Sequence, residues 1–267
     1  MTAGTISVVI PTFNSSSTIQ RALDSLAAQT LLPAEIIVVD NASTDDTVEI
    51  IRQFAKQHLD IRCSIEVLTQ NLGPGAARNH GWDRASGDLI AFLDSDDSWH
   101  PEKLARQRQI TFDYPKTMLF GHQYEVVQPG GQPVVGELSK EAGIDFFVLS
   151  QFLIRNRVST PTVMVRRNVS ERFPSTFWHG EDYALWLAIV AKHGPAVVLR
   201  QSLTYLHKPA YGASGLSADM KRMHQGELLA VQRLRTSGDL GHLRTSLAVS
   251  WMRLKYLRRL VKMARRV

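Results

Sequence analysis

The first 100 residues alternate short runs of continuous apolar, β-branched residues with longer stretches of helical pattern. A strand that is apolar on both faces must be covered on both faces, so this alternation predicts a mostly parallel β-sheet between layers of helices. In such sheets ligands bind at the carboxyl ends of the strands, so the residues directly after each strand are the first candidates for a site. The four predicted strands are Ile6–Ile10, Glu35–Val39, Ser64–Leu68 and Asp88–Leu93, and the helices between them end near Ala28, Gln57 and Ala85.

The pattern after residue 117 is more mixed. A strand-like run from Met118 meets Pro129-Gly-Gly and resumes at Pro133, which predicts a β-hairpin. Helices are expected at Glu181–Lys192 and over most of the chain after residue 217. We therefore expect an α/β unit at 1–217 and a C-terminal helical extension at 218–267. Further short strands are expected at Val163–Arg166, Ala196–Leu199 and Leu203–Leu206.

Charge is unevenly distributed along the chain, whose formal net charge is +6. Residues 1–150 carry 19 acidic residues and 11 Lys or Arg, whereas residues 151–267 carry 6 and 20. The acidic half suits a site that binds cations and argues against a nucleic-acid-binding face there. The basic half predicts an anionic partner, either a phosphate-bearing molecule or a lipid.

The chain has the features of a cytoplasmic protein. No stretch approaches about eighteen consecutive apolar residues, so no transmembrane helix is expected. The N-terminus lacks the basic start and apolar run of a signal peptide, because Ile6–Ile10 leads directly into Pro11. The single cysteine, Cys63, fits a reducing compartment.

An acidic cluster, Asp94-Ser95-Asp96-Asp97, closes the fourth predicted strand. Three carboxylates in four residues repel one another, so the cluster needs a cation, and Mg²⁺ or Mn²⁺ is the natural candidate. The alternative is a solvated acidic turn. A calcium loop is excluded, because Trp99 stands at its glycine position and Ala105 at its bidentate glutamate position.

Polar residues also follow the other predicted strands. Asp40 can accept hydrogen bonds from a ribose or a base, and otherwise is a turn residue. The backbone of Pro11-Thr-Phe-Asn14 can meet a base, and otherwise only ends a strand. The loop at 71–79, which contains Gly75 and leads into a helix, favours phosphate binding, with Arg78 one turn further on.

Two candidates lie in the second half of the chain. Glu181 and Asp182 open a helix, where acids are ordinary partners of the helix dipole, but Asp182 is also a candidate general base. His207 follows a predicted strand and is either a structural histidine or a ligand for metal or phosphate.

Five motifs together resemble those of family 2 glycosyltransferases, in the family's order and spacing, over about residues 5–215. They are VVIPTFN (8–14), VVDNAST (38–44), NLGPGAARNHG (71–81), FLDSDD (92–97) and GEDYALW (180–186). The resemblance implies a Rossmann-like GT-A fold over 1–217. It also implies a nucleotide-diphosphate sugar donor, expected to be a UDP-sugar, and transfer of a hexosyl or N-acetylhexosaminyl group with inversion at the anomeric carbon.

Carried over by position, the resemblance implies a role for each matching residue. Asp94 and Asp96 form the DxD pair that holds Mn²⁺ or Mg²⁺ and the donor, and His207 joins them as a metal or diphosphate ligand. Asp182 is the catalytic base. The segment 207–217 is longer than the family's His-x-x-Ser pattern, which leaves the place of Ser214 open. The nucleotide-sugar site then comprises Pro11, Asn14, Asp40, Asn71, Gly75, Arg78, Asp94, Ser95, Asp96, His207 and Ser214.

These assignments predict a single displacement at a hydroxyl of a glycan or lipid-linked acceptor in cell-surface polysaccharide synthesis. Such a reaction forms no covalent enzyme intermediate, which agrees with the lack of an activated Ser or Cys nucleophile. The acceptor is expected near Trp99, Trp178 and Glu181. The alternatives are a sugar-phosphate nucleotidylyltransferase, which needs a glycine-rich basic loop after the first strand, and an inactive nucleotide-sugar-binding module.

The C-terminal segment Leu247–Val267 carries seven Lys or Arg and no acid. On a helical wheel most of these cations fall on one side and the leucines on the other, which predicts a basic amphipathic helix that lies in an anionic membrane surface. The protein is then peripheral at the inner face of the cell membrane. The alternative is that Leu254 and its neighbours dock on the catalytic domain.

Overall fold

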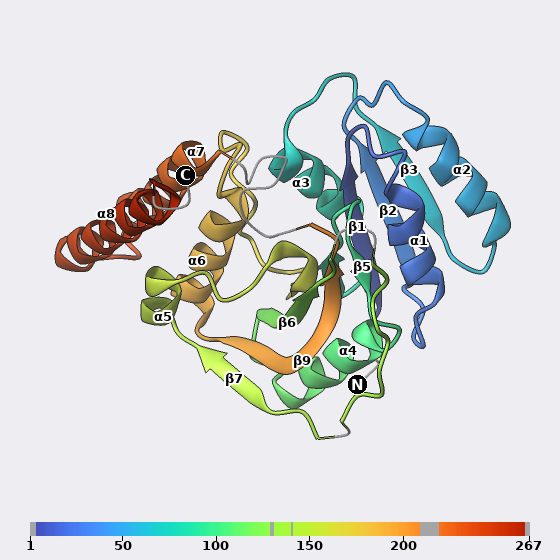
Figure 1. Cartoon of the computed structure of the whole chain (residues 1–267). Coiled ribbons are helices and arrows are strands. Elements are labelled where there is room, and N and C mark those ends of the chain that lie inside the picture. Colours follow the sequence, from blue (N-terminus) through green and yellow to red (C-terminus); the bar gives the residue numbers. More distant parts are fainter. Residues whose placement is uncertain (1–3, 129–130, 140, 209–218, 265–267) are drawn as a thin grey trace.

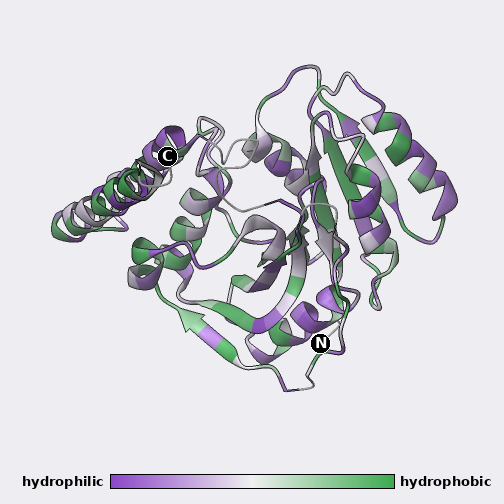
Figure 2. Ribbon diagram, in the orientation of Figure 1, coloured by the Kyte–Doolittle hydropathy of each residue, from purple (hydrophilic) through white to green (hydrophobic). Residues whose placement is uncertain are grey.

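One twisted sheet forms the centre of the molecule in the computed structural model, which describes residues 4–128, 131–139, 141–208 and 219–264 (Figure 1). Its first half is parallel: β1 lies between β2 and β4, and β3 pairs with the outer edge of β2. The residues of β1 and β2 are all buried, as their continuous apolar sequences require (Figure 2). These strands span β1 (Ile6–Thr12), β2 (Glu35–Asp40), β3 (Cys63–Val67) and β4 (Leu89–Phe92).

The second half of the sheet adds antiparallel pairs. β8 pairs antiparallel with both β4 and β6, and β6 runs parallel to the long strand β9, which curves beneath the sheet's centre (Figure 1). β5 and β7 each pair antiparallel with β9. The bounds are β5 (Ser98–Trp99), β6 (Leu119–Val126), β7 (Ile144–Phe147), β8 (Met164–Arg166) and β9 (Ala196–Leu206).

Helices cover both faces of the sheet. Successive strand residues point to opposite faces, and apolar side chains stand on both of them. Val8 and Ile10 pack in one buried cluster with α1, α2 and α4, whereas Val9 packs in the other with α3, α5 and α6. The helices are α1 (Ile19–Ala27), α2 (Thr47–Gln57), α3 (Pro74–Arg84), α4 (Lys103–Asp113), α5 (Leu149–Ile154) and α6 (Glu181–His193), with a 3₁₀ turn at Thr160–Thr162.

Two C-terminal helices, α7 (Met220–Thr236) and α8 (His242–Ala264), extend the layer beyond α6. Ala230 and Val231 of α7 and Met252 of α8 are buried in the same cluster as α6, so the extension shares the core of the α/β unit. At the start of α6, Gly226 of α7 lies so close to the backbone that a Cβ there would meet the carbonyl oxygen of His179 at 2.0 Å. No described helix is both long and apolar enough to cross a membrane.

The mixed α/β fold and the first four strands are confirmed, and so are β8 and the helix α6. The expected hairpin is wrong: the described residues 131–139 contain no strand, and β6 pairs with β8 and β9 instead. The two strands expected at 196–199 and 203–206 are one strand, β9, whose pairing with β6 shifts in register near Gln123. The division at residue 217 falls within 209–218, outside the described residues, and stays a prediction.

Close packing of α3 on the sheet gives a test of the fold. A Cβ on Gly81 would lie 2.5 Å from Cγ1 of Val9 and 3.1 Å from Cγ2 of Val39, both in the core. We expect Gly81→Ala to lower the free energy of unfolding by about 1–3 kcal/mol, and Val9→Ala to recover part of the loss. Gly136→Ala, which meets no atom within 4 Å, is the matched control in chemical denaturation. Equal stability of the two alanine variants would contradict this packing.

Candidate active site

A cleft of about 620 Å³ opens at the carboxyl ends of β1, β2 and β4. The first turn of α6 and the end of β9 complete its wall. Residues from eight separated stretches of the chain therefore meet here, at the edge of the sheet where a parallel fold places its sites. Its lining includes Pro11, Thr12, Asn41, Asn71, Arg78, Asp94, Ser95, Asp96, Asp97, Thr160, Trp178, Glu181, Asp182 and Lys208.

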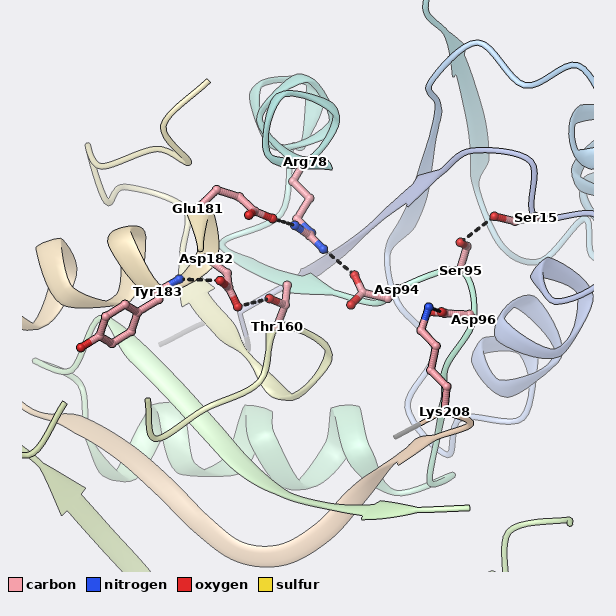
Figure 3. Close-up of polar contacts among 10 residues, drawn as sticks. All are labelled: Ser15, Arg78, Asp94, Ser95, Asp96, Thr160, Glu181, Asp182, Tyr183 and Lys208. Carbon is pink, nitrogen blue, oxygen red and sulfur yellow. Dashed lines mark hydrogen bonds and ion pairs between the residues drawn. The ribbon is translucent and has the colours of Figure 1, made fainter. Parts of the chain in front are cut away.

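The acidic cluster after β4 lies inside this cleft and is compensated by cations of the chain (Figure 3). Asp94 accepts a hydrogen bond from Nη2 of Arg78 at 2.7 Å, and Asp96 forms an ion pair with Lys208. Asp97 is 4% exposed, and burial together with Asp96 and Asp94 raises its pKa well above the usual range. The cluster is thus a charged wall of the cleft, not a solvated turn.

Arg78 joins the two acidic parts of the site. Its Nη1 donates to Oε1 of Glu181 at 3.0 Å while Nη2 holds Asp94 (Figure 3). Burial alone would lower its pKa, but the two carboxylates outweigh burial and the pKa of Arg78 is raised. Gly75 permits this arrangement, because a Cβ at that position would come within 2.9 Å of Cγ of Glu181.

The acidic pair at the start of α6 is placed by the backbone of Gly180, which has φ +73. Asp182 accepts hydrogen bonds from Oγ1 of Thr160 at 3.2 Å and from the backbone N–H of Tyr183 at 2.7 Å. Burial raises the pKa of Asp182 above its usual range, against the opposing effect of Arg78. Burial and then Asp182 raise the pKa of Glu181 to about 7, also against Arg78.

Beyond β1 and β2, amide side chains fix the loops at the other end of the cleft. Nδ2 of Asn41 donates to Oδ1 of Asn71 at 2.8 Å. Asn14 has φ 48 and its Oδ1 accepts the N–H of Thr44, so it connects two loops and does not line the cleft. Asp40 is fully buried behind the lining, with one oxygen on the N–H of Ser43 and the other without a partner.

The remaining candidates lie in different places. Trp178 lines the cleft and is 47% exposed. Trp99 is 3% exposed and donates its Nε1 hydrogen to the carbonyl oxygen of Pro161, so it is a core residue and not an acceptor contact. His207 stands behind the lining, with Nε2 2.8 Å from Oγ of Ser98, and burial lowers its pKa. Ser214 lies outside the described residues.

The donor set fits one type of metal ion. Among the described residues there is no cluster of three His, Cys, Asp or Glu that suits a metal. Mg²⁺ and similar ions, however, often take only one or two carboxylates and complete their shell with substrate phosphates and water. Asp94 and Asp96, which here pair with Arg78 and Lys208, supply two such carboxylates on the cleft lining, whereas His207 lies behind that lining on Ser98.

Sequence reasoning missed three residues of the cleft. Lys208 pairs with Asp96, Thr160 holds Asp182, and Asn41 supports Asn71. Only Asn41 carried a signal, because it directly follows a predicted strand. The other two depend on which loops meet in space.

Comparison with known proteins agrees with this geometry. The sequence profile described as "Glycosyl transferase family 2" matches residues 7–172. WfgD of Escherichia coli, named UDP-Glc:alpha-D-GlcNAc-diphosphoundecaprenol beta-1,3-glucosyltransferase, is 31% identical over 187 residues, which cover 69% of this chain and 69% of WfgD.

Two solved structures share the fold. Residues 1–349 of S. aureus TarS, in complex with UDP-GlcNAc, are 23% identical with a TM-score of 0.71, covering 92% of this chain and 70% of that TarS chain. The mannosyltransferase PcManGT from Pyrobaculum calidifontis, in complex with GDP-Man and Mn²⁺, is 19% identical with a TM-score of 0.69, covering 97% of this chain and 75% of that chain. The fold is therefore of the GT-A type. The chain belongs to glycosyl transferase family 2 and is a glycosyltransferase, which replaces the nucleotidylyltransferase alternative.

Arg78 provides the test of the site's electrostatics. Arg78→Met leaves two partly or fully buried carboxylates without their cation, so we expect unfolding free energy to fall by about 3–5 kcal/mol. Adding Glu181→Gln should restore part of that stability. Arg52→Met removes only an exposed pair with Glu49 and should change stability by less than about 1 kcal/mol. If both arginine variants unfold at the same denaturant concentration, the bridge is not stabilising.

Proposed function

We propose that this protein transfers a sugar, with inversion, from a nucleotide-diphosphate donor to an acceptor hydroxyl, with Asp182 as the general base. The observation that carries the proposal is the placement of Asp182 in the same cleft as Asp94 and Asp96. A hydroxyl held over Asp182 can lose its proton to the carboxylate while the oxygen attacks the sugar from the face opposite the leaving diphosphate.

The local contacts favour Asp182 over Glu181 as the base. The carboxylate of Glu181 is buried and already paired with Arg78, whereas Asp182 is half-buried at the cleft and accepts hydrogen bonds from two neutral donors. Burial raises the pKa of both carboxylates toward the range that base catalysis near neutral pH uses, so it is their contacts that distinguish Asp182 from Glu181.

The opposite wall suits the diphosphate. A bound Mg²⁺ or Mn²⁺ would offset the charge that builds on the leaving diphosphate. Asp94 and Asp96 are the residues that would hold it, and Lys208 lies beside them as a further cation for the diphosphate. Mn²⁺ accompanies GDP-Man in the PcManGT structure, which supports this reading.

The donor's nucleoside fits the end of the cleft near β1 and β2. Pro11 and Asn71 line it there, and the buried Oγ1 of Thr12 and Oδ1 of Asp40 lack hydrogen-bond partners. Buried polar atoms are normally satisfied, so these two are candidates to bind the ligand directly or through water. We propose UDP as the nucleotide, which the names of WfgD and of the TarS complex support.

We further propose a lipid-linked acceptor at an anionic membrane surface, in the synthesis of a cell-surface polysaccharide. WfgD is named for a diphosphoundecaprenol-linked acceptor. Helix α8 packs on α7 through residues such as Ala248 and Met252 and leaves a stripe of large apolar side chains exposed, which does not favour docking of these leucines on the catalytic domain. That stripe comprises Leu243, Leu247, Trp251, Leu254, Leu257 and Val261, each 38–75% exposed.

Two substitutions test the chemistry. Asp182→Asn should keep donor binding while turnover falls at least about a hundredfold, because the base is lost. Asp96→Ala should lose the metal-dependent part of UDP-sugar binding, measured by calorimetry with and without Mn²⁺. Asp60→Asn, an exposed site far from the cleft lining, is the control for both. Normal turnover of Asp182→Asn would remove its assignment as the base.

Vesicle binding tests the membrane proposal. We expect the wild-type protein to sediment with vesicles that contain phosphatidylglycerol and less with phosphatidylcholine alone, since each cation near anionic lipid contributes about 1 kcal/mol. Leu254→Glu with Leu257→Glu should abolish most of this binding. Leu59→Glu changes a leucine that is 87% exposed in the loop between α2 and β3, and it should not reduce vesicle binding. Sedimentation of the double variant at the wild-type level would sink the proposal.

A further inference from the structure

An apolar groove of about 560 Å³ runs between α5 and α8, outside the cleft. Its walls are mainly aliphatic, and Arg244 is the one charged residue among those that line it. The carbonyl oxygen of Ile154, at the end of α5, accepts hydrogen bonds from Nε1 of Trp251 at 3.0 Å and Nζ of Lys255 at 3.1 Å. These two bonds fix α8 against α5, so the groove is a built feature of the fold.

The groove is close to the active site along the chain. Ile154 lines the groove and Ser159 lines the cleft. Five residues of extended chain span at most about 18 Å, so the Cα atoms of these two residues are no farther apart than that. A hydrogen bond also connects α5 to the start of α6. The hydroxyl of Tyr183, next to Asp182, donates to the carbonyl oxygen of Phe152 at 2.9 Å.

Two arginines lie on the connecting stretch. Arg155 is exposed, and Arg157 is held half-buried by a hydrogen bond to the carbonyl oxygen of Gln151 and by the ring of Phe147, 4.8 Å from its guanidinium carbon. Neither forms an ion pair with a carboxylate in the part of the chain that the structure describes. Guanidinium groups without a carboxylate partner, between an apolar groove and a sugar-transfer site, suit a diphosphate.

We propose that this path binds the acceptor as a lipid diphosphate-linked sugar, with the sugar at Asp182, the diphosphate at Arg155 and Arg157, and the hydrocarbon chain in the groove. The inference rests on the proposed function, because it places an acceptor hydroxyl at Asp182. The connection from Ile154 to Ser159, at most about 18 Å, is short enough that one acceptor molecule with a sugar, a diphosphate and a hydrocarbon chain can reach both the cleft and the groove.

The exposed stripe of α8 explains how the hydrocarbon chain continues. Leu247 and Trp251 belong both to the stripe and to the lining of the groove. A chain that leaves the groove therefore passes directly onto the surface that we propose to face the bilayer. A free sugar or a soluble glycan has no use for such a connection, so the groove specifies the class of acceptor.

Farnesyl diphosphate, an isoprenoid diphosphate without a sugar, is the probe for this site. Its binding is measured by Trp fluorescence or calorimetry below its micelle concentration, with the donor cleft saturated by UDP and Mg²⁺. We expect it to bind the wild-type protein at least about tenfold more tightly than inorganic diphosphate does. Arg155→Gln with Arg157→Gln should weaken its binding about tenfold, and so should Leu247→Glu.

The controls separate the two ends of the site. Arg167→Gln changes an exposed arginine outside both linings, and Leu229→Glu changes an exposed leucine of α7 outside both linings and outside the stripe; neither should change binding. Arg155→Gln alone serves if the double variant is unstable. Asp182→Asn should bind farnesyl diphosphate normally, so a failed base assignment leaves this result intact.

Three results would overturn the proposal. The first is that farnesyl diphosphate does not bind the wild-type protein. The second is that farnesyl diphosphate binds only when UDP is left out, and that the arginine and leucine variants then bind it normally, which assigns the binding to the donor cleft. The third is that sedimentation shows a wild-type dimer that Leu247→Glu dissociates, which makes the groove a contact between two copies of the chain.

Discussion

The guanidinium of Arg78 binds two carboxylates from separate parts of the chain and so connects the two acidic parts of the site. One guanidinium binds Asp94, at the end of β4 and 16 residues from Arg78, and Glu181, in the first turn of α6 and 103 residues from Arg78. Without this cation, burial of Glu181 beside Asp182 and the crowding of three aspartates after β4 would oppose folding. The same contact pairs the carboxylate of Glu181 with a cation, whereas Asp182 receives hydrogen bonds only from Thr160 and the backbone N–H of Tyr183.

The parallel half of the sheet could be predicted from sequence because its strands carry their own signal. Each of β1, β2 and β4 is a continuous apolar run, and the structure places them within two residues of the expected bounds. The antiparallel half lacks such a signal. β5 is only two residues long. β9 contains Arg200 and Gln201 in its middle, so its sequence pattern predicts two short strands instead of one curved strand. One partner of β6, the strand β9, lies nearly 80 residues later, which no local pattern indicates.

Prediction of the site was limited in the same way. Residues directly after predicted strands, such as Pro11 and Asp94, can be predicted because the topology sends strand ends to one edge of the sheet. Lys208 and Thr160 were missed, because an ion pair or a hydrogen bond between loops depends on how those loops pack. Trp99 shows the opposite error: its aromatic ring suggested a sugar contact, but its indole N–H serves the core through Pro161.

The close approach of Gly226 to the carbonyl oxygen of His179 has a consequence for the orientation of the whole enzyme. With no room for a side chain at that crossing, α7 is seated directly on the turn that starts α6. Helix α8 is about 34 Å long at 1.5 Å per residue, and it packs on α7, so the position of α7 on α6 also determines the orientation of α8. On the proposed bilayer, the tilt of α8 in the lipid would then set the orientation of the whole molecule. It would fix the distance and the angle between the carboxylate of Asp182 and the membrane surface.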